Sequence, residues 1–197
     1  MNISRARGLT VSFRFVEVDD AEYILSLRLN PESNRYISPT VPSVEKQREW
    51  LASYKEQELV EMEYCYIITN NNDDTPCGVI QLYNFNNGIF EWGSLILDDN
   101  KTPSAAIEAA FFIYSVAFDL LGFDKSHFTV HKENVRTVIF QKRLGARIIG
   151  EQQTQIGAEH LFEFDKNDWL LAQQKFKKFM PAPYEATTRR AFQKHRQ

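Results

Sequence analysis

With 197 residues, the chain has the length of one ordinary domain and does not require two. Hydrophobic residues make up 43% of it and aromatic residues 13%, which excludes a wholly disordered chain. A net charge of −3 argues against a general nucleic-acid binder, and the N-terminal residues lack the apolar run of a secretion signal, so we expect a cytoplasmic protein.

Hydrophobic periodicity, capping residues and turn residues predict the elements in chain order. They are a loose leader over 1–9, a strand at 9–18, a helix at 20–29, a loop at 30–42, a helix at 43–57, strands at 63–69, 77–85 and 89–97, a helix at 103–121, a strand at 126–130, a helix at 133–145, a hairpin of 146–152 and 159–164, and a helix at 166–180. In the helix at 43–57 we expect four side chains to face inward: Val44, Trp50, Leu51 and Tyr54.

The strands at 63–69, 77–85 and 89–97 are joined by short turns and predict an antiparallel meander. The complete order predicts one mixed sheet with helices, of the α+β or α/β class, in a single domain over 1–180 with its core at about 10–165. No internal repeat or linker is found. Residues 181–197 are predicted to form a polar, basic tail.

From Lys175 to the end of the chain, seven Lys and Arg residues stand against one Glu. We expect a solvated tail, and the alternative is a nucleic-acid module whose salt-sensitive binding is lost when 181–197 is deleted. Cys65 and Cys77 give neither a disulfide framework nor a metal cluster. They are expected to be free thiols, although a pairing across neighbouring strands is conceivable. The most apolar run, 105–121, carries Glu108 and Asp119, which predicts a buried helix and no membrane span.

The junction "LDDNKTPSAAIEAAF" joins a predicted strand to a predicted helix. Such junctions often bind phosphate, because the first N–H groups of a helix have no partner within it. Thr102 before Pro103 suits an N-cap, Pro103 suits the first helical position, and the small residues that follow allow a ligand to approach. A capped core helix is the alternative interpretation, and the absence of glycine between Leu97 and Phe111 favours it.

Two further stretches could contribute chemistry. In "FEWGSLIL", Glu91 lies on a strand of apolar and small residues, so it is a candidate base or water anchor, or else a solvent-facing strand residue. Gly93 in the same strand indicates a bulge or a close backbone approach. In "NVRTVIFQKRLGA", Asn134 can cap a helix that Gly145 ends.

The histidines indicate no metal site. His127 and His131 share one strand face but are four residues apart, which is roughly 13 Å and too far for two ligands of one ion. His160 lies on the last hairpin, and no Cys/His cluster, P-loop or nucleophile elbow is present. We therefore expect structural or solvated histidines and no bound metal.

Together the three stretches resemble the GNAT acyl-CoA N-acyltransferases over about residues 10–165. The likeness is to the branch that includes ribosomal-protein N-terminal acetyltransferases and bacterial amino-sugar N-acetyltransferases. It rests on "EWGSLIL" before the loop, on Ser104 four residues before the Glu108–Ala109 pair, and on Asn134 followed by Gly145–Ala146. The stretch "RLNPESNRYISPTVPSVEKQREWL" is similar to the first two helices of that branch, which line the acceptor side.

The resemblance implies a mixed, mostly antiparallel sheet that splays between its fourth and fifth strands, 89–97 and 126–130. Acetyl-CoA would lie in this gap, and a primary amine would attack its thioester directly. Glu91, through water, would take up the amine proton, and a backbone N–H near Leu95 would stabilise the oxyanion. The residues implied to contact the cofactor are Leu95, Leu97, Lys101, Thr102, Ser104, Ala105, Ala106, Asn134 and Phe140.

Two departures from the family pattern stand out. The family loop, Gln/Arg-x-x-Gly-x-Gly/Ala, has lost its leading Gln/Arg and both glycines here, so Lys101 would supply charge to the phosphates. A Tyr that many members use to protonate the leaving thiolate is replaced by Gln141. Ser94, Tyr83 or water would serve instead, or the acid is dispensable, because a thiol is a good leaving group.

The acceptor implied is a small amine such as a nucleotide-linked amino sugar, with Arg35, Tyr36 and Tyr83 facing it. A protein N-terminus is the first alternative, and a GNAT module that binds CoA or a partner without catalysis is the second. We expect no nucleic-acid, membrane or metal partner, and a monomer or a homodimer.

Overall fold

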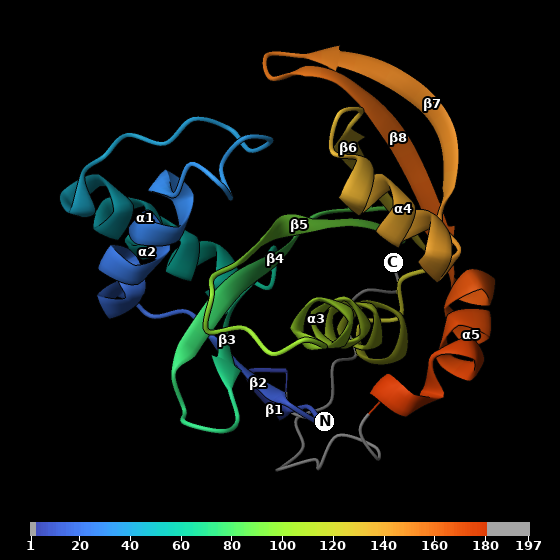
Figure 1. Ribbon diagram of the computed structural model, residues 1–197, viewed down its shortest axis with the longest axis horizontal. Coiled ribbons are helices and arrows are strands. Elements are labelled where there is room, and N and C mark those ends of the chain that lie inside the picture. Colours follow the sequence, from blue (N-terminus) through green and yellow to red (C-terminus); the bar gives the residue numbers. More distant parts are fainter. Residues whose placement is uncertain (1–2, 181–197) are drawn as a thin grey trace.

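A mixed eight-stranded sheet forms the centre of the computed structural model, which describes residues 3–180 (Figure 1). The strand order is β1-β2-β3-β4-β5-β6-β8-β7, and every neighbouring pair is antiparallel except β5 and β6, which are parallel. The strands are β1 Arg5–Arg7, β2 Val11–Phe15, β3 Tyr64–Asn70, β4 Pro76–Asn86, β5 Ile89–Leu97, β6 Lys125–His131, β7 Arg147–Thr154 and β8 Gly157–Asp165. The predicted α+β class and the predicted mostly antiparallel sheet are confirmed.

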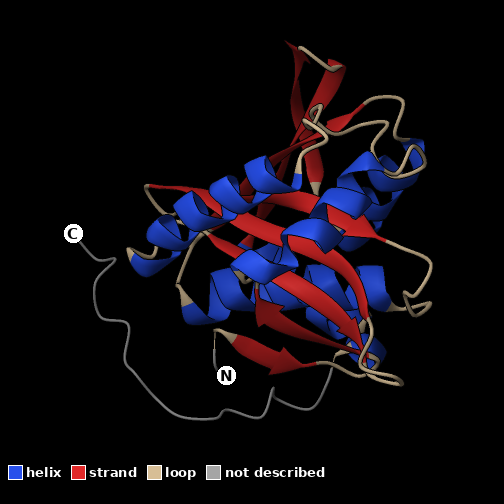
Figure 2. Cartoon of the chain, turned by 90° about the vertical axis from the view of Figure 1, so that its left-hand side faces the viewer, coloured by secondary structure: helices blue, strands red, loops and turns tan. Residues whose placement is uncertain are grey.

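Helices cover both faces of the sheet (Figure 2). They are α1 Ala21–Leu29, α2 Val44–Leu59, α3 Ala105–Tyr114, α4 Val135–Leu144 and α5 Lys166–Lys175, and 3-10 turns lie at Val18–Asp20 and Lys177–Phe179. The apolar faces of α1 and α2 pack on one side of β3, β4 and β5, and α3 packs on the other side with α5 beside it. None of these helices has the length and apolarity that a membrane span requires.

The sheet separates between β5 and β6. Their registered pairs are limited to Ile89 with Lys125 and Phe90 with Ser126, so the later parts of the two strands are not paired with each other. On its other edge β5 carries a bulge, because Gly93 pairs with Gln81 but Ile96 already pairs with Val79. Ser94, at φ 50°, lies in this bulge. A bulge bends its strand and increases the local twist, so it changes the direction of β5 within the part that is not paired with β6.

The helix that follows β6 has the predicted caps. The Asn134 side chain accepts a hydrogen bond from the backbone N–H of Thr137, and Gly145 adopts the left-handed conformation, with φ 117°, that ends the helix. These two caps fix where α4 begins and ends beside the gap between β5 and β6.

Four sequence predictions were wrong in detail. Residues 5–7 form β1 and pair with β2, although a loose leader was predicted. The helix predicted at 103–121 begins at Ala105 and continues as a π-helix over Ser115–Leu120. Trp50 was predicted to face inward but is 43% exposed. The last helix ends at Lys175, since a separate 3-10 turn follows it.

The two cysteines are buried free thiols, Cys65 on β3 and Cys77 on β4. Burial raises the pKa of both thiols, that of Cys77 to about 12, so both are protonated at neutral pH. The tail predicted at 181–197 lies outside the described residues.

Candidate active site

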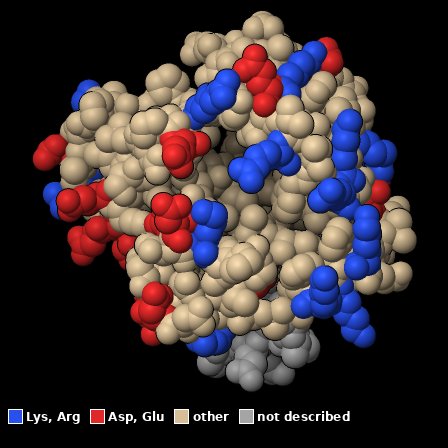
Figure 3. Space-filling model, in the orientation of Figure 1, with Lys and Arg blue, Asp and Glu red and all other residues tan. Residues whose placement is uncertain are grey.

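A cleft opens where β5 and β6 part. Its volume is about 360 Å³, and β5, β6, α4, the start of α3 and the loop between α1 and α2 line it. Figure 3 shows a hollow in this face of the molecule with basic side chains at its rim. Six of the residues predicted for the site line this cleft: Tyr36, Ser94, Leu95, Ala106, Asn134 and Phe140. The cleft therefore brings together residues from four separate stretches of the sequence.

Ser94 and Leu95 lie in the β5 bulge, beyond Phe90, the last residue of that strand that pairs with β6. A bulge leaves backbone groups of the bulged strand without partners in the ladder. Such N–H groups are the kind of donor that stabilises an oxyanion or pairs with an amide-containing ligand. Trp92 and Phe128 close the cleft on the side of α3, with 5.8 Å between their ring centroids.

Glu91 lies on the same strand but is not among the residues that line the cleft. Its Oε1 accepts a hydrogen bond of 3.3 Å from the Tyr83 hydroxyl, and its Oε2 accepts one of 2.8 Å from Asn84 Nδ2. Burial raises the pKa of Tyr83, and the Glu91 charge raises it further, so the phenol is protonated and can donate. Contact between Glu91 and a ligand in the cleft would therefore require a bridging water.

The loop before α3 is fixed by the first part of the chain. The Thr10 hydroxyl lies 2.6 Å from the Thr102 hydroxyl and 2.9 Å from the Ser104 hydroxyl. Thr102 is not the N-cap that the sequence predicts, because helix α3 begins three residues later and its first N–H, of Ala105, bonds to the Thr102 carbonyl. The hydroxyls of this loop thus serve protein contacts, and Ala106 is the residue of the helix start that lines the cleft.

Lys101 and Leu97 lie outside the cleft lining. The Lys101 side chain is half exposed, and its Nζ donates to the Asp98 carbonyl at 3.0 Å and lies 3.8 Å from an Asp99 oxygen. Ala105 is fully buried. Of the predicted loop residues, Lys101 is the one whose charge is available to a ligand at the surface.

A contact across the cleft mouth joins the loop at 30–42 to the turn after β6. The Tyr36 ring lies on the His131 ring with 4.9 Å between centroids, and its hydroxyl donates to the Glu133 carbonyl at 3.1 Å. Arg35 forms an exposed ion pair of 3.8 Å with Glu133. This contact places Tyr36 and His131 on the wall of the cleft.

Two buried polar side chains in the cleft were not predicted as site residues. Gln141 is 3% exposed, and its Oε1 has no hydrogen-bond partner within residues 3–180. Glu159, on β8, is 7% exposed. The sequence marks Gln141 only as the residue that replaces the family's Tyr and gives no sign of Glu159, because both become buried only when β8 and α4 pack beside β6.

A second, smaller cavity of about 270 Å³ lies between the first two helices and the sheet. Its walls are largely apolar, and Trp50, Arg28 and Lys46 line it together with Ser94, which also lines the cleft. Arg28 donates to the Thr40 hydroxyl and to the Ser38 carbonyl, and burial lowers its pKa. The cavity and the cleft thus meet at the β5 bulge.

No group of three His, Cys, Asp or Glu side chains that could hold a metal ion occurs within the described part of the chain. Instead, the site combines an apolar gap between parallel strands, a bulged strand, a helix start and buried polar groups.

A family model described as "Acetyltransferase (GNAT) domain" matches residues 11–147. The chain belongs to the GNAT acetyltransferase family. It is accordingly an N-acetyltransferase, and the splayed sheet is the GNAT fold that the sequence resemblance implied. No curated protein sequence matches the chain significantly.

Solved GNAT structures share this fold. An apo structure of FdhC, described as a nucleotide-linked sugar GNAT, is 35% identical, covers 90% of this chain and 98% of its own, and has a TM-score of 0.82. A ribosomal-protein-S5-alanine acetyltransferase from Vibrio fischeri is 13% identical, covers 84% and 98%, and has a TM-score of 0.72. A spermidine N-acetyltransferase from Vibrio cholerae is 16% identical, covers 82% and 96%, and has a TM-score of 0.68. At these identities the last two show the fold alone.

Proposed function

We propose that this GNAT enzyme transfers an acetyl group from acetyl-CoA to the primary amine of a nucleotide-linked amino sugar. The observation that carries the proposal is the cleft between β5 and β6, which meets a second cavity at the bulged residue Ser94. The likeness to a nucleotide-linked sugar GNAT, at 35% identity over nearly both chains, supports the acceptor class.

The cleft residues fit the pantetheine arm of acetyl-CoA. Leu95 and Phe140 offer apolar walls, and the buried Gln141 Oε1 offers an acceptor for an amide N–H. The backbone of β5 near Leu95 and Leu97 would pair with the arm. The start of α3 at Ala106 and the charge of Lys101 would receive the phosphates, with Asn134 at the start of α4 on the opposite wall.

The chemistry requires a neutral amine. At neutral pH a primary amine is largely protonated, so Glu91 takes up its proton through a water molecule, with Tyr83 holding the carboxylate. The neutral amine nitrogen then bonds to the thioester carbonyl carbon, and the C–S bond breaks with its electron pair left on sulfur. The nitrogen, which is positive after it bonds, releases its second proton to solvent, so the product is a neutral amide. Gln141 has no acidic proton to give, so Ser94, Tyr83 or solvent returns a proton to the thiolate.

The second cavity would hold the nucleotide part of the acceptor. Trp50 has an exposed aromatic surface there, on which a nucleobase can stack. Arg28 and Lys46 place positive charge beside it, which suits a diphosphate. Tyr36 and Arg35 of the loop would face the sugar at the cleft mouth.

The proposal is tested in two steps. Calorimetry with acetyl-CoA measures cofactor binding, and release of free thiol is then followed with dTDP- and UDP-linked amino sugars, polyamines and peptides that carry ribosomal-protein N-termini. We expect turnover with the amino sugars. Turnover with the peptides alone would identify a protein N-terminal acetyltransferase, and binding without turnover on any amine would indicate a CoA-binding module.

A further inference from the structure

Glu159 is a buried charge in the wall of the cleft. Within residues 3–180, Glu108 and Glu159 are the two charged residues that are buried, and Glu159 alone of the two lines the cleft. It lies on β8, where its Cα pairs with that of His131 on β6. Its position is therefore on the same wall as His131 and Tyr36, on the side of the loop that closes the cleft mouth.

The two buried carboxylates differ in what compensates their charge. Glu108 accepts hydrogen bonds from the Thr10 backbone N–H at 3.0 Å, the Thr10 hydroxyl at 2.6 Å and the Ser104 hydroxyl at 2.7 Å. Glu159 accepts one hydrogen bond, of 3.2 Å, from Gln152 Nε2 on β7. The described residues provide no ion pair for it. A buried carboxylate with so little compensation is costly, and a cationic partner would recover that cost.

The nearest histidine does not supply this cation. The Nδ1 atom of His131 accepts a hydrogen bond of 3.2 Å from the backbone N–H of Glu133. The ion pairs of histidines in residues 3–180 are those of His127 with Glu163 and of His160 with Glu151, so His131 forms none with Glu159. Arg136 also lines the cleft, but its side chain is exposed and forms no ion pair with Glu159 within the described residues. The charge of Glu159 is therefore left for a cationic ligand in the cleft to match.

The negative charge of Glu159 also affects Tyr83, which lies on β4 next to the place where the acceptor amine is proposed to react. It contributes, behind burial and the closer Glu91, to the raised pKa of Tyr83 on β4. Its negative field thus extends across the cleft to the face of β4 and β5 that carries Tyr83 and Glu91. An amine entering from the second cavity would come to lie between these groups.

We propose that Glu159 binds the ammonium group of the acceptor, and so selects an amine over the hydroxyl of an otherwise identical sugar. The proposal rests on the proposed function, because it requires an amine acceptor. It assigns recognition of the charged group to Glu159 and leaves removal of the proton to Glu91. A hydroxyl in the place of the ammonium would leave the buried carboxylate without a cation.

The test uses Glu159→Gln, which keeps the shape of the side chain and an acceptor for Gln152. Dissociation constants are measured by calorimetry for the best amino sugar of the panel and for its hydroxyl counterpart, with UDP-glucosamine and UDP-glucose as the first pair. We expect the variant to lose about ten- to hundred-fold in affinity for the amine and to bind the hydroxyl sugar within about threefold of the wild type.

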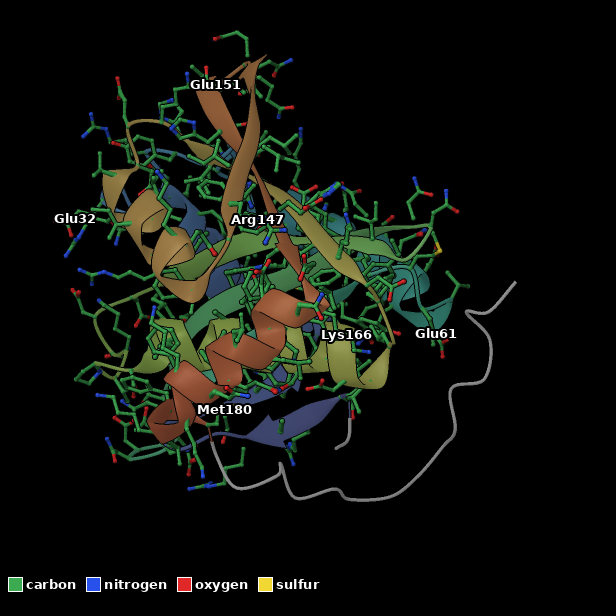
Figure 4. All side chains as sticks on the ribbon, turned by 90° about the vertical axis from the view of Figure 1, so that its right-hand side faces the viewer. Glu32, Glu61, Arg147, Glu151, Lys166 and Met180 are labelled. Atoms are coloured by element: carbon green, nitrogen blue, oxygen red, sulfur yellow. The ribbon has the colours of Figure 1, made fainter. Side chains whose placement is uncertain are left out.

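Glu151→Gln is the matched control. Glu151 lies on the neighbouring strand β7 toward the tip of the hairpin (Figure 4), and its side chain is 57% exposed and paired with Lys132. We expect this variant to bind both sugars as the wild type does. An equal change in affinity for the two sugars in Glu159→Gln, or no change, would overturn the inference while the proposed function stands. Absence of turnover on every amine would overturn both.

Discussion

The Tyr83 hydroxyl donates a hydrogen bond of 3.3 Å to Oε1 of Glu91, and the two residues pair directly across β4 and β5. Asn84 holds the other carboxylate oxygen at 2.8 Å. Gly93 beside them is needed for this arrangement, because a Cβ there would lie 2.8 Å from the same hydroxyl. The carboxylate is therefore fixed in orientation next to the bulge where the reaction is proposed to take place.

We expect Glu91→Gln to lower kcat by about a hundredfold, as loss of a general base does, and to leave the Kd for acetyl-CoA within about threefold. Stopped assays of thiol release, together with calorimetry, measure both effects. Glu63→Gln is the control, since that carboxylate contacts Gln81 and lines neither the cleft nor the second cavity. Equal losses in kcat and in cofactor affinity would show that Glu91 is structural.

Trp50→Ala tests the second cavity. We expect the KM for the nucleotide-linked acceptor to rise about ten- to hundredfold, because stacking on an aromatic side chain contributes about 1–3 kcal/mol per base, and the KM for acetyl-CoA to stay unchanged. Steady-state kinetics with each substrate varied in turn separate the two. Leu59→Ala is the control, because Leu59 is on the same helix and 81% exposed but lines neither cavity. A rise in both KM values would mean that Trp50 supports the fold of α2 and does not bind the acceptor.

Local sequence signals were sufficient for most of the fold. Asn134 and Gly145 mark the ends of α4 because a side-chain cap and a left-handed residue are properties of a few neighbouring residues. The meander of β3, β4 and β5 follows from alternation and short turns. The strand β1 was missed, since its three residues are held by pairing with β2 and not by their own propensity.

The site was harder to predict because its parts meet through tertiary contacts. The phosphate site is predicted at the backbone N–H groups of residues 102–106, but the sequence does not predict that the hydroxyls of Thr102 and Ser104 contact Thr10, more than 90 residues earlier in the chain. Burial of Glu159 depends on where β8 lies beside β6. Both features depend on residues that are far apart in the sequence. A short window of sequence therefore cannot predict them, and only the structure shows them.

Removal of the buried Glu108 carboxylate should destabilise the protein. Glu108→Ala leaves the Thr10 backbone N–H and two hydroxyls without their acceptor, so we expect the free energy of unfolding to fall by about 3 kcal/mol. Urea denaturation followed by circular dichroism measures this change. Glu108→Gln keeps one acceptor oxygen and should lose less than the alanine variant. A stability of Glu108→Ala within about 0.5 kcal/mol of the wild type would contradict the role assigned to this cluster.

The charge cluster around Glu163 on β8 predicts a pH-dependent contribution to stability. Hydrogen bonds from His127, Lys125 and Arg147 lower the pKa of Glu163 to about 2 from its ordinary 4.5 (Figure 4 labels Arg147). Because the folded-state pKa is depressed, the stabilisation is complete above pH 4.5 and is lost as the pH falls toward 2. Glu163→Gln should therefore unfold at lower urea than the wild type at pH 7, and this difference should shrink at pH 3. The exposed Glu32→Gln should show no difference at either pH. If the difference in urea concentration of unfolding between Glu163→Gln and the wild type were equal at both pH values, the effect of the substitution would come from packing and not from charge.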